Sequence, residues 1–210
     1  MSPEGTPVRI SRTVQLTSAA LGALCLLTAC GGKTDSGNKP SAAPASSSAD
    51  VAANLKVPAP LPTGDLLSNP CAVIAPGQFD ALNFAGAGTK SDSARDPSVG
   101  PDCRWVSKKN DGNVIFVGSL PGNKNGISDI YAGKAQAAYF DPVTVAGYPG
   151  VFSDVHDGRP SGNCTVWVGV TDRLAASVNA QISSADAKSN TCAIAQNVAE
   201  AMIHHLKGAA

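Results

Sequence analysis

The clearest alternation of apolar and polar positions lies between residues 164 and 181. Its first run places apolar side chains on one face, at Cys164, Val166, Val168 and Val170. After Thr171-Asp172-Arg173, a second run does the same at Leu174, Ala176, Val178 and Ala180. Strict alternation is typical of a strand with one buried face. These two runs therefore predict a hairpin, with Trp167 on the face opposite the valines.

Two further pairs of strands follow from local patterns. The runs 103–107 and 114–117 flank Asn110-Asp111-Gly112-Asn113, and an Asp-Gly pair between β-rich runs is a strong hairpin signal. The runs 142–145 and 151–155 flank Gly147-Tyr148-Pro149-Gly150, which we expect to form the turn. Together the patterns predict five to six strands, mostly antiparallel.

Helices are predicted at four places. Asn69-Pro70-Cys71 is a typical helix start, Pro76 begins a second helix, and residues 127–138 have helical spacing. The last helix begins at Asn190 or Thr191 and carries an apolar stripe: Cys192, Ala195, Ala199, Met202 and Leu206. The predicted fold class is α+β, with the helices packed largely on one face of the sheet.

The N-terminal 29 residues read as an export signal. Arg9 and Arg12 supply positive charge, and residues 14–27 form an apolar run. This run ends in Leu27-Thr28-Ala29-Cys30. That end resembles the bacterial lipobox, in which the Cys is acylated before cleavage. We therefore expect a lipoprotein signal peptide over 1–29 and a mature chain anchored through Cys30 to the extracytoplasmic face of the cell membrane. The alternative is an ordinary cleavage site with an incidental Cys.

Residues 30–64 are rich in Ser, Ala and Pro and poor in large apolar side chains. Such a composition buries too little apolar surface to offset the entropy of ordering, so we expect a disordered tether after the lipidated Cys30. The folded, disulfide-stapled domain is predicted over 65–210.

The remaining cysteines indicate two disulfides. Cys25 leaves with the signal and Cys30 would carry lipid, which leaves Cys71, Cys103, Cys164 and Cys192 in an oxidising compartment. Four cysteines allow three connectivities. We favour 71 with 103 and 164 with 192, because each pair then joins elements of one half of the domain.

Charge and motifs exclude several functions. Without residues 1–29 the chain has 14 Lys and Arg against 15 Asp and Glu and no basic run, so the sequence shows no electrostatic footprint for nucleic acid or anionic lipid. The cysteines show no close CxxC spacing, and no cofactor or metal is predicted. The segment 86–91 fails the phosphate-loop pattern at Thr89.

Catalytic candidates are few. His156 lies near Ser153, Asp154, Asp157 and Ser161, a set that could be imagined as a hydrolytic cluster. However, residues 157–162 read as an exposed turn. His204-His205 lies in the last turn of the predicted final helix, where positive charge complements the helix dipole. The alternative function is therefore an envelope hydrolase that uses His156 or an Asp, while no catalytic residue is predicted.

Aromatic side chains are the remaining candidates for binding. Trp105, Trp167 and Tyr148 could line a ligand groove, since large flat side chains with a polar tip are common in binding surfaces. The competing interpretation places Trp105 in the core beside a disulfide and Tyr148 as a cover residue at a turn. For Trp167 the binding interpretation and the core interpretation are equally favoured.

Several motifs in this order resemble an actinobacterial lipoprotein family classed as domain of unknown function 3558. They are the lipobox, the tether, Asn69-Pro70-Cys71, Cys103-Arg104-Trp105, the segment 145–150 and the late pair Cys164 and Cys192. The resemblance implies a surface lipoprotein with an α+β domain and two disulfides, and no reaction. We expect a non-catalytic domain that binds a small apolar or glycan ligand or a protein partner. A purely structural role is the third hypothesis.

Overall fold

The fold is taken from a computed structural model that describes residues 55–92, 98–109, 111–184 and 188–208. The predicted signal peptide, the lipidation at Cys30 and most of the predicted tether lie outside the described residues.

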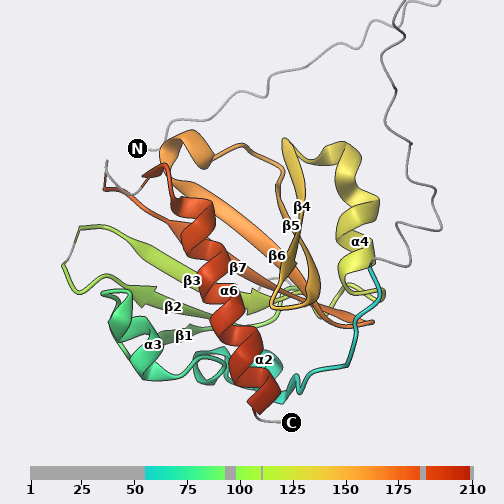
Figure 1. The fold of residues 1–210 in the computed structure, drawn as a ribbon, viewed down its shortest axis with the longest axis horizontal. Helices are drawn as coiled ribbons and strands as arrows, with labels where there is room; N and C mark the ends of the chain where they lie inside the picture. Colours follow the sequence, from blue (N-terminus) through green and yellow to red (C-terminus); the bar gives the residue numbers. More distant parts are fainter. Residues whose placement is uncertain (1–54, 93–97, 110, 185–187, 209–210) are drawn as a thin grey trace, which may run out of the picture. The chain divides into compact units, whose positions relative to one another are not determined.

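Seven antiparallel strands form one sheet in the described part of the chain, in the order β1-β2-β3-β7-β6-β5-β4 (Figure 1). The strands are β1 (Thr89–Ser91), β2 (Asp102–Val106), β3 (Val114–Ser119), β4 (Tyr139–Val145), β5 (Tyr148–Asp154), β6 (Asn163–Thr171) and β7 (Leu174–Gln181). The antiparallel sheet is as predicted, but the count of five to six strands is one short. The additional strand is β1, three exposed residues without the alternation that marks a half-buried strand.

The hairpins follow the predicted pairs. β6 pairs with β7 so that Val166 faces Val178 and Val168 faces Ala176, and all four side chains are buried. The β4–β5 turn differs from the prediction: it consists of Ala146 and Gly147, with φ of 47° and 90°. Two positive φ values are the signature of a type I′ turn, whose twist matches that of the flanking strands. Tyr148, Pro149 and Gly150 therefore belong to β5.

Four helices are described: α2 (Gly64–Ser68), α3 (Pro76–Ala81), α4 (Ile127–Ala132) and α6 (Thr191–Gly208). Short 3-10 helices follow at η1 (Pro70–Ala72), η2 (Gly133–Gln136) and η3 (Arg159–Ser161). The helix predicted over 127–138 is thus an α-helix only to Ala132. It passes into η2 at Gly133, the residue whose backbone freedom disfavours a continuous helix.

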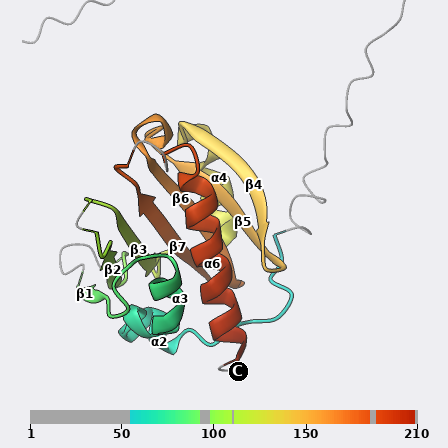
Figure 2. The same ribbon diagram turned by 60° about the vertical axis from the view of Figure 1, so that its left-hand side comes forward.

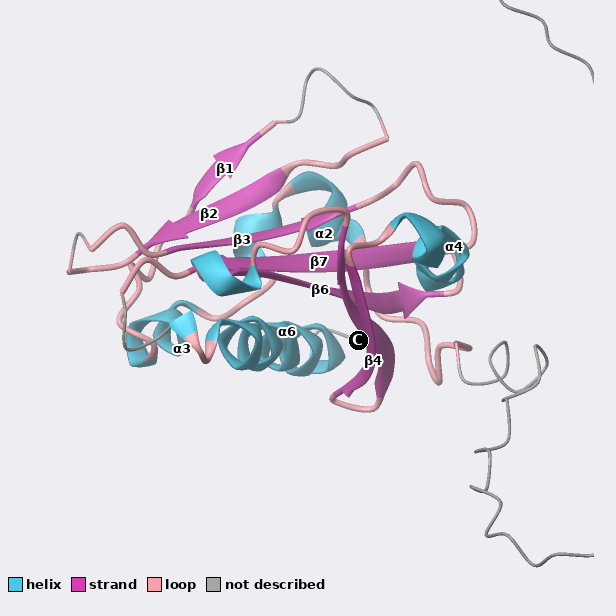
Figure 3. Ribbon diagram, turned by 90° about the horizontal axis from the view of Figure 1, so that it is seen from above, coloured by secondary structure: helices cyan, strands magenta, loops and turns pink. Residues whose placement is uncertain are grey.

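The helices do not confirm the prediction of a single covered face. α6 lies across β6 and β7, and α3 lies beside it on the same side of the sheet (Figures 1 and 3). α4 packs on the opposite face, where Ile127 meets Val151 and Ala175. The second face has a small apolar cluster of its own, in which Trp167 and Phe140 pack against Ile127, Val151 and Ala175.

The main core lies between the sheet and α6. The buried stripe of α6 consists of Ala195, Val198, Ala199, Met202, Ile203 and Leu206. It packs on the inward side chains of β6 and β7. Figure 2 shows α6 lying along this face of the sheet from a second side. The predicted stripe is correct except at Cys192, which is half-buried and forms a disulfide.

The two disulfides join Cys71 to Cys103 and Cys164 to Cys192. This is the pairing favoured from the sequence. The first fastens η1 to β2, and the second fastens the first turn of α6 to the start of β6. Each closes a loop of about 30 residues, which raises stability by about 3 to 4 kcal/mol in the chain-entropy account.

Part of the segment predicted as tether belongs to the folded domain. Val57 and Leu61 are 4% and 6% exposed and lie in the main core. Three hydrogen bonds hold the segment: Val57 N–H donates to Asp172 Oδ1, Tyr148 Oη–H to the carbonyl of Ala59, and Leu61 N–H to the carbonyl of Val170. The domain boundary predicted at residue 65 is therefore too late, because two apolar side chains spaced among prolines suffice to bind the segment to the domain.

None of the helices in the described residues has both the length and the apolar character required to cross a bilayer.

Candidate functional site

Trp105 and Tyr148 are core residues. Trp105 is 1% exposed and stacks on Phe79 of α3, with ring centroids 4.2 Å apart. Tyr148 is 2% exposed, and the Lys207 ammonium lies 4.9 Å from its ring centroid. Both side chains belong to the core on the α6 side of the sheet. Neither lines a surface groove in the described part of the chain.

Trp167 lies on the other face, as its place in the alternation predicts. It is half-buried beside α4, and its indole N–H donates to the carbonyl of Ser153 at 3.0 Å. The three aromatic candidates are thus separated by the sheet and do not form one binding surface.

His156 is exposed in the loop after β5. Its neighbours are committed to other partners: Asp154 accepts from Thr165 Oγ1 at 3.0 Å, and Asp157 forms an ion pair with Arg159 at 2.8 Å. Hydrogen bonds from Arg159 lower the pKa of Asp157 below its usual range, and the same bonds raise the pKa of Arg159. This is the geometry of a charged turn that is fixed by its own ion pairs.

No group of three or more His, Cys, Asp or Glu side chains within the described ranges is placed to hold a metal ion. His204 and His205 lie in the last turns of α6, where His204 is exposed and His205 is half-buried.

A row of polar side chains crosses the second face of the sheet. Asn179 donates from Nδ2 to Asn163 Oδ1 at 2.7 Å and to Thr165 Oγ1 at 2.8 Å, and Gln181 donates to Asn179 at 3.0 Å. The two bonds from Asn179 run from β7 to the neighbouring strand β6, and the bond from Gln181 lies within β7. An antiparallel sheet commonly leaves one face to solvent, and this row is the polar surface that such a face requires.

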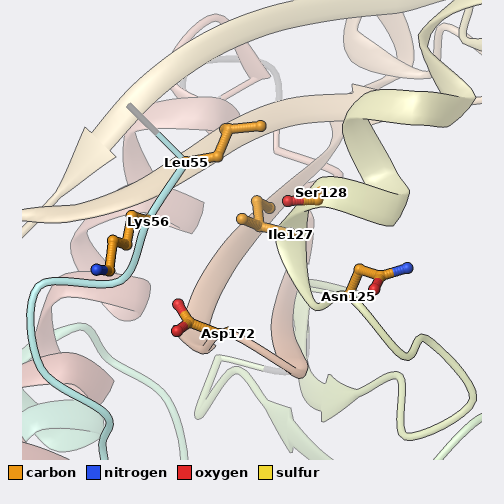
Figure 4. A pocket seen from close by; sticks show the side chains of 6 residues that line it. All are labelled: Leu55, Lys56, Asn125, Ile127, Ser128 and Asp172. Atoms are coloured by element: carbon orange, nitrogen blue, oxygen red, sulfur yellow. The ribbon is translucent and has the colours of Figure 1, made fainter. Parts of the chain in front are cut away.

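Two hollows flank the β6–β7 turn. The first has a volume of about 250 Å³ and is lined by Leu55, Lys56, Asn125, Ile127, Ser128 and Asp172 (Figure 4). Figure 4 shows that these polar groups do not converge: the Lys56 ammonium points to one side, and the Asn125 amide to the other. The lining therefore does not resemble a site that grips one small polar molecule.

The second hollow adjoins the same turn and has a volume of about 400 Å³. It is lined by Thr63, Leu67, Pro121, Asn123, Lys124, Thr171, Arg173 and Leu174. Leu67 is 42% exposed and is a large apolar side chain in the lining of this hollow. We call the linings of the two hollows together the turn surface.

The loop that separates the two hollows is held firmly. The Asp129 carboxylate accepts from the backbone N–H groups of Lys124 and Asn125 at 2.9 and 3.0 Å, and from the Asn125 amide at 2.9 Å. These bonds, first of all the one from the Asn125 side chain, lower the pKa of Asp129. Gly126, at φ 53°, packs so closely on the β6–β7 turn that a Cβ would lie 2.9 Å from the carbonyl oxygen of Thr171.

The turn surface carries three cations, Lys56, Lys124 and Arg173, and none of them forms an ion pair within the described residues. They come from the first described segment, the loop before α4 and the β6–β7 turn. No local motif marks them in the sequence, since only the fold brings these three segments together. An exposed apolar side chain beside unpaired cations can bind a partner that presents both apolar and anionic groups.

Comparison with known proteins identifies a family. Residues 25–205 match the family described as "Protein of unknown function (DUF3558)". No curated protein and no solved structure matches the chain. Because the match covers most of the chain, the protein belongs to this family of unknown function.

Proposed function

We propose that the protein is a lipid-anchored lipoprotein of the cell envelope whose domain binds a partner through the turn surface. In this proposal Cys30 carries the acyl anchor on the extracytoplasmic face of the membrane, and residues 31–54 form the tether. The domain acts by binding and not by catalysis.

The anchor is supported by two independent features. Leu27-Thr28-Ala29-Cys30 ends an apolar run at the place where an acylated Cys is expected, and the domain beyond it is braced by two disulfides. Disulfides persist in oxidising compartments, so a cross-linked domain is consistent with an export signal at its N-terminus.

Binding through the turn surface is supported by one observation above all. A hollow of about 400 Å³ is lined by the exposed Leu67 and by two cations, Lys124 and Arg173, that lack an ion-pair partner in the described residues. An exposed apolar patch rimmed by polar groups is typical of an interaction site.

The anchor is tested by labelling cells with a palmitate analogue. The natural protein should take up the label, and the Cys30→Ser variant should lose it. Incorporation that is unchanged in the variant would exclude acylation at this residue. Mass spectrometry of peptides kept under non-reducing conditions should find 71 joined to 103 and 164 joined to 192, and four free thiols would place the protein in a reducing compartment.

The binding surface is tested with a photo-crosslinking amino acid in living cells. Placed at position 67, it should form crosslinks to envelope material. Val155, which is 62% exposed on the loop after β5, is the matched control position. Equal crosslinking from positions 67 and 155 would contradict a specific role for the turn surface.

A further inference from the structure

We propose that the partner of the turn surface is the anionic phospholipid surface of the membrane to which the chain is anchored. This inference rests on the proposed lipid anchor and adds an orientation: the domain lies with the β6–β7 turn toward the headgroups.

The first ground is where the chain joins the domain. The described chain begins at Leu55, and Leu55 and Lys56 themselves line the first hollow (Figure 4). The following residues are fixed to the same end of the sheet, because Val57 N–H donates to Asp172 in the β6–β7 turn. A chain anchored at Cys30 therefore joins the domain at the turn surface. This connection favours orientations in which the turn surface is nearer to the membrane than the opposite end of the domain.

The second ground is charge. Lys56, Lys124 and Arg173 are all exposed and lie outside the ion pairs of the described residues. The facing acidic groups are Asp172 and Asp129, and both carboxylates accept backbone hydrogen bonds. These hydrogen bonds hold the two carboxylates near the backbone without removing their charge, so the three cations exceed the facing acids by one. The longer cationic side chains are exposed, and phosphate oxygens can reach them.

The third ground is shape. The polar groups that line the first hollow diverge (Figure 4), whereas the polar groups of a small-molecule site converge on a ligand that is mostly enclosed. Leu67 and Pro121 are exposed beside the cations. Such a side-chain set suits the boundary between headgroups and acyl chains. The tether also supplies an effective concentration in the millimolar range, so that docking of low affinity is sufficient.

The test is lysine footprinting of the lipidated full-length protein in vesicles. Protein is reconstituted into neutral phosphatidylcholine vesicles and into vesicles that contain phosphatidylglycerol as well, and lysine acetylation rates are measured by mass spectrometry. Lys56 and Lys124 should react at least about threefold more slowly in the anionic vesicles. Lys108 and Lys109, exposed in the β2–β3 hairpin region, are internal controls and should react equally in both.

A variant strengthens the test. Arg173→Glu should abolish the protection of Lys124, while the matched charge reversal Lys109→Glu should leave it intact. Equal acetylation of Lys124 in both kinds of vesicle would overturn the inference. Protection in native membranes without protection in pure vesicles would also overturn it, and would indicate a protein partner instead.

Membrane anchoring is measured separately in the same samples, as flotation of the protein with the vesicles. Failure to float with neutral vesicles refutes lipidation at Cys30, and thus the proposed function itself. Flotation without differential protection refutes only the docking.

Discussion

The contacts of Trp105 with individual neighbours explain why this side chain belongs to the core and not to a binding groove. Its ring lies between Phe79, at a centroid distance of 4.2 Å, and the backbone of Gly88. At position 88 a Cβ would overlap Cys103 Sγ and lie 2.7 Å from Cε2 of Trp105. Glycine is required here by contact, because any side chain would displace the disulfide or the indole.

Gly88→Ala should therefore destabilise the domain by about 1 to 3 kcal/mol through overpacking. Gly77→Ala is the control, because a Cβ at this helical position meets nothing within 4 Å and should stabilise the protein by about 0.5 to 1 kcal/mol. Urea unfolding under non-reducing conditions measures both. An unchanged free energy of unfolding in Gly88→Ala would show that β1 can move away from Trp105.

Asp102 is the side chain whose charge opposes folding. Its Oδ1 is buried without a hydrogen-bond partner in the described residues, and burial raises the pKa of the carboxyl above 3.8. A raised pKa in the folded state means that the protonated form is favoured by folding. This contribution is fully present below pH 3.8 and is lost as the pH rises through the folded-state pKa.

Asp102→Asn should consequently have a higher melting temperature than the natural protein at pH 7, and the difference should disappear near pH 3. Thermal unfolding followed by circular dichroism at the two pH values measures this. Asp92→Asn, which removes an exposed carboxylate in an ion pair with Lys90, should cause little change. An equal benefit of Asp102→Asn at both pH values would assign the effect to packing.

The secondary-structure elements follow the sequence wherever alternation is complete. In β6 and β7 an apolar side chain recurs at every second position, from Cys164 to Val170 and from Leu174 to Ala180, and their hairpin was predictable. The β4–β5 turn was not, because Gly147-Tyr148-Pro149-Gly150 has turn-forming residues at both ends. The structure places the turn at Ala146-Gly147, since this register buries Tyr148 and Pro149. Tertiary packing thus overrides the local preference of Pro149-Gly150.

The strained position in this turn is Ala146, a residue with a Cβ at φ 47°. Ala146→Asn creates the Asn-Gly pair that type I′ turns prefer, and should stabilise the domain by about 0.5 to 1 kcal/mol. Gly147→Ala, at φ 90°, should destabilise it by a similar amount or more. Denaturant midpoints compare the two. A loss of stability in Ala146→Asn would show that this turn does not limit the hairpin.

For the whole domain, the decisive feature is where it begins. Residues 55–61 look like tether because Pro58, Pro60 and the preceding Ser-rich segment suggest no packing. In the structure Val57 and Leu61 bury their side chains against the ends of β5, β6 and β7. The same segment brings Lys56 to Lys124 and Arg173, so the domain boundary and the turn surface arise together.

A chain that lacks residues 31–64 should therefore be less stable than one that lacks only 31–54. Loss of the two buried side chains removes about 3 to 6 kcal/mol, at about 1.5 to 3 kcal/mol for each. Deletion of 31–54 should leave the unfolding free energy unchanged. Urea titration of both deletion variants measures the difference. Equal stabilities would support the domain boundary predicted at residue 65.

The amino-acid sequence alone was sufficient to predict the antiparallel sheet and the last helix, because alternation and helical spacing are local. For the four cysteines it favoured the observed pairing among three possible ones, since that pairing joins neighbouring elements of each half of the domain. It could not locate the turn surface. Lys56, Lys124 and Arg173 are isolated cations in three separate segments, and their grouping depends on long-range packing. Likewise, alternation predicts the face of the strand on which Trp167 lies, but the cover of that face by α4 depends on the fold. Only the tertiary structure decides such questions, because burial and proximity depend on the elements that pack against a residue.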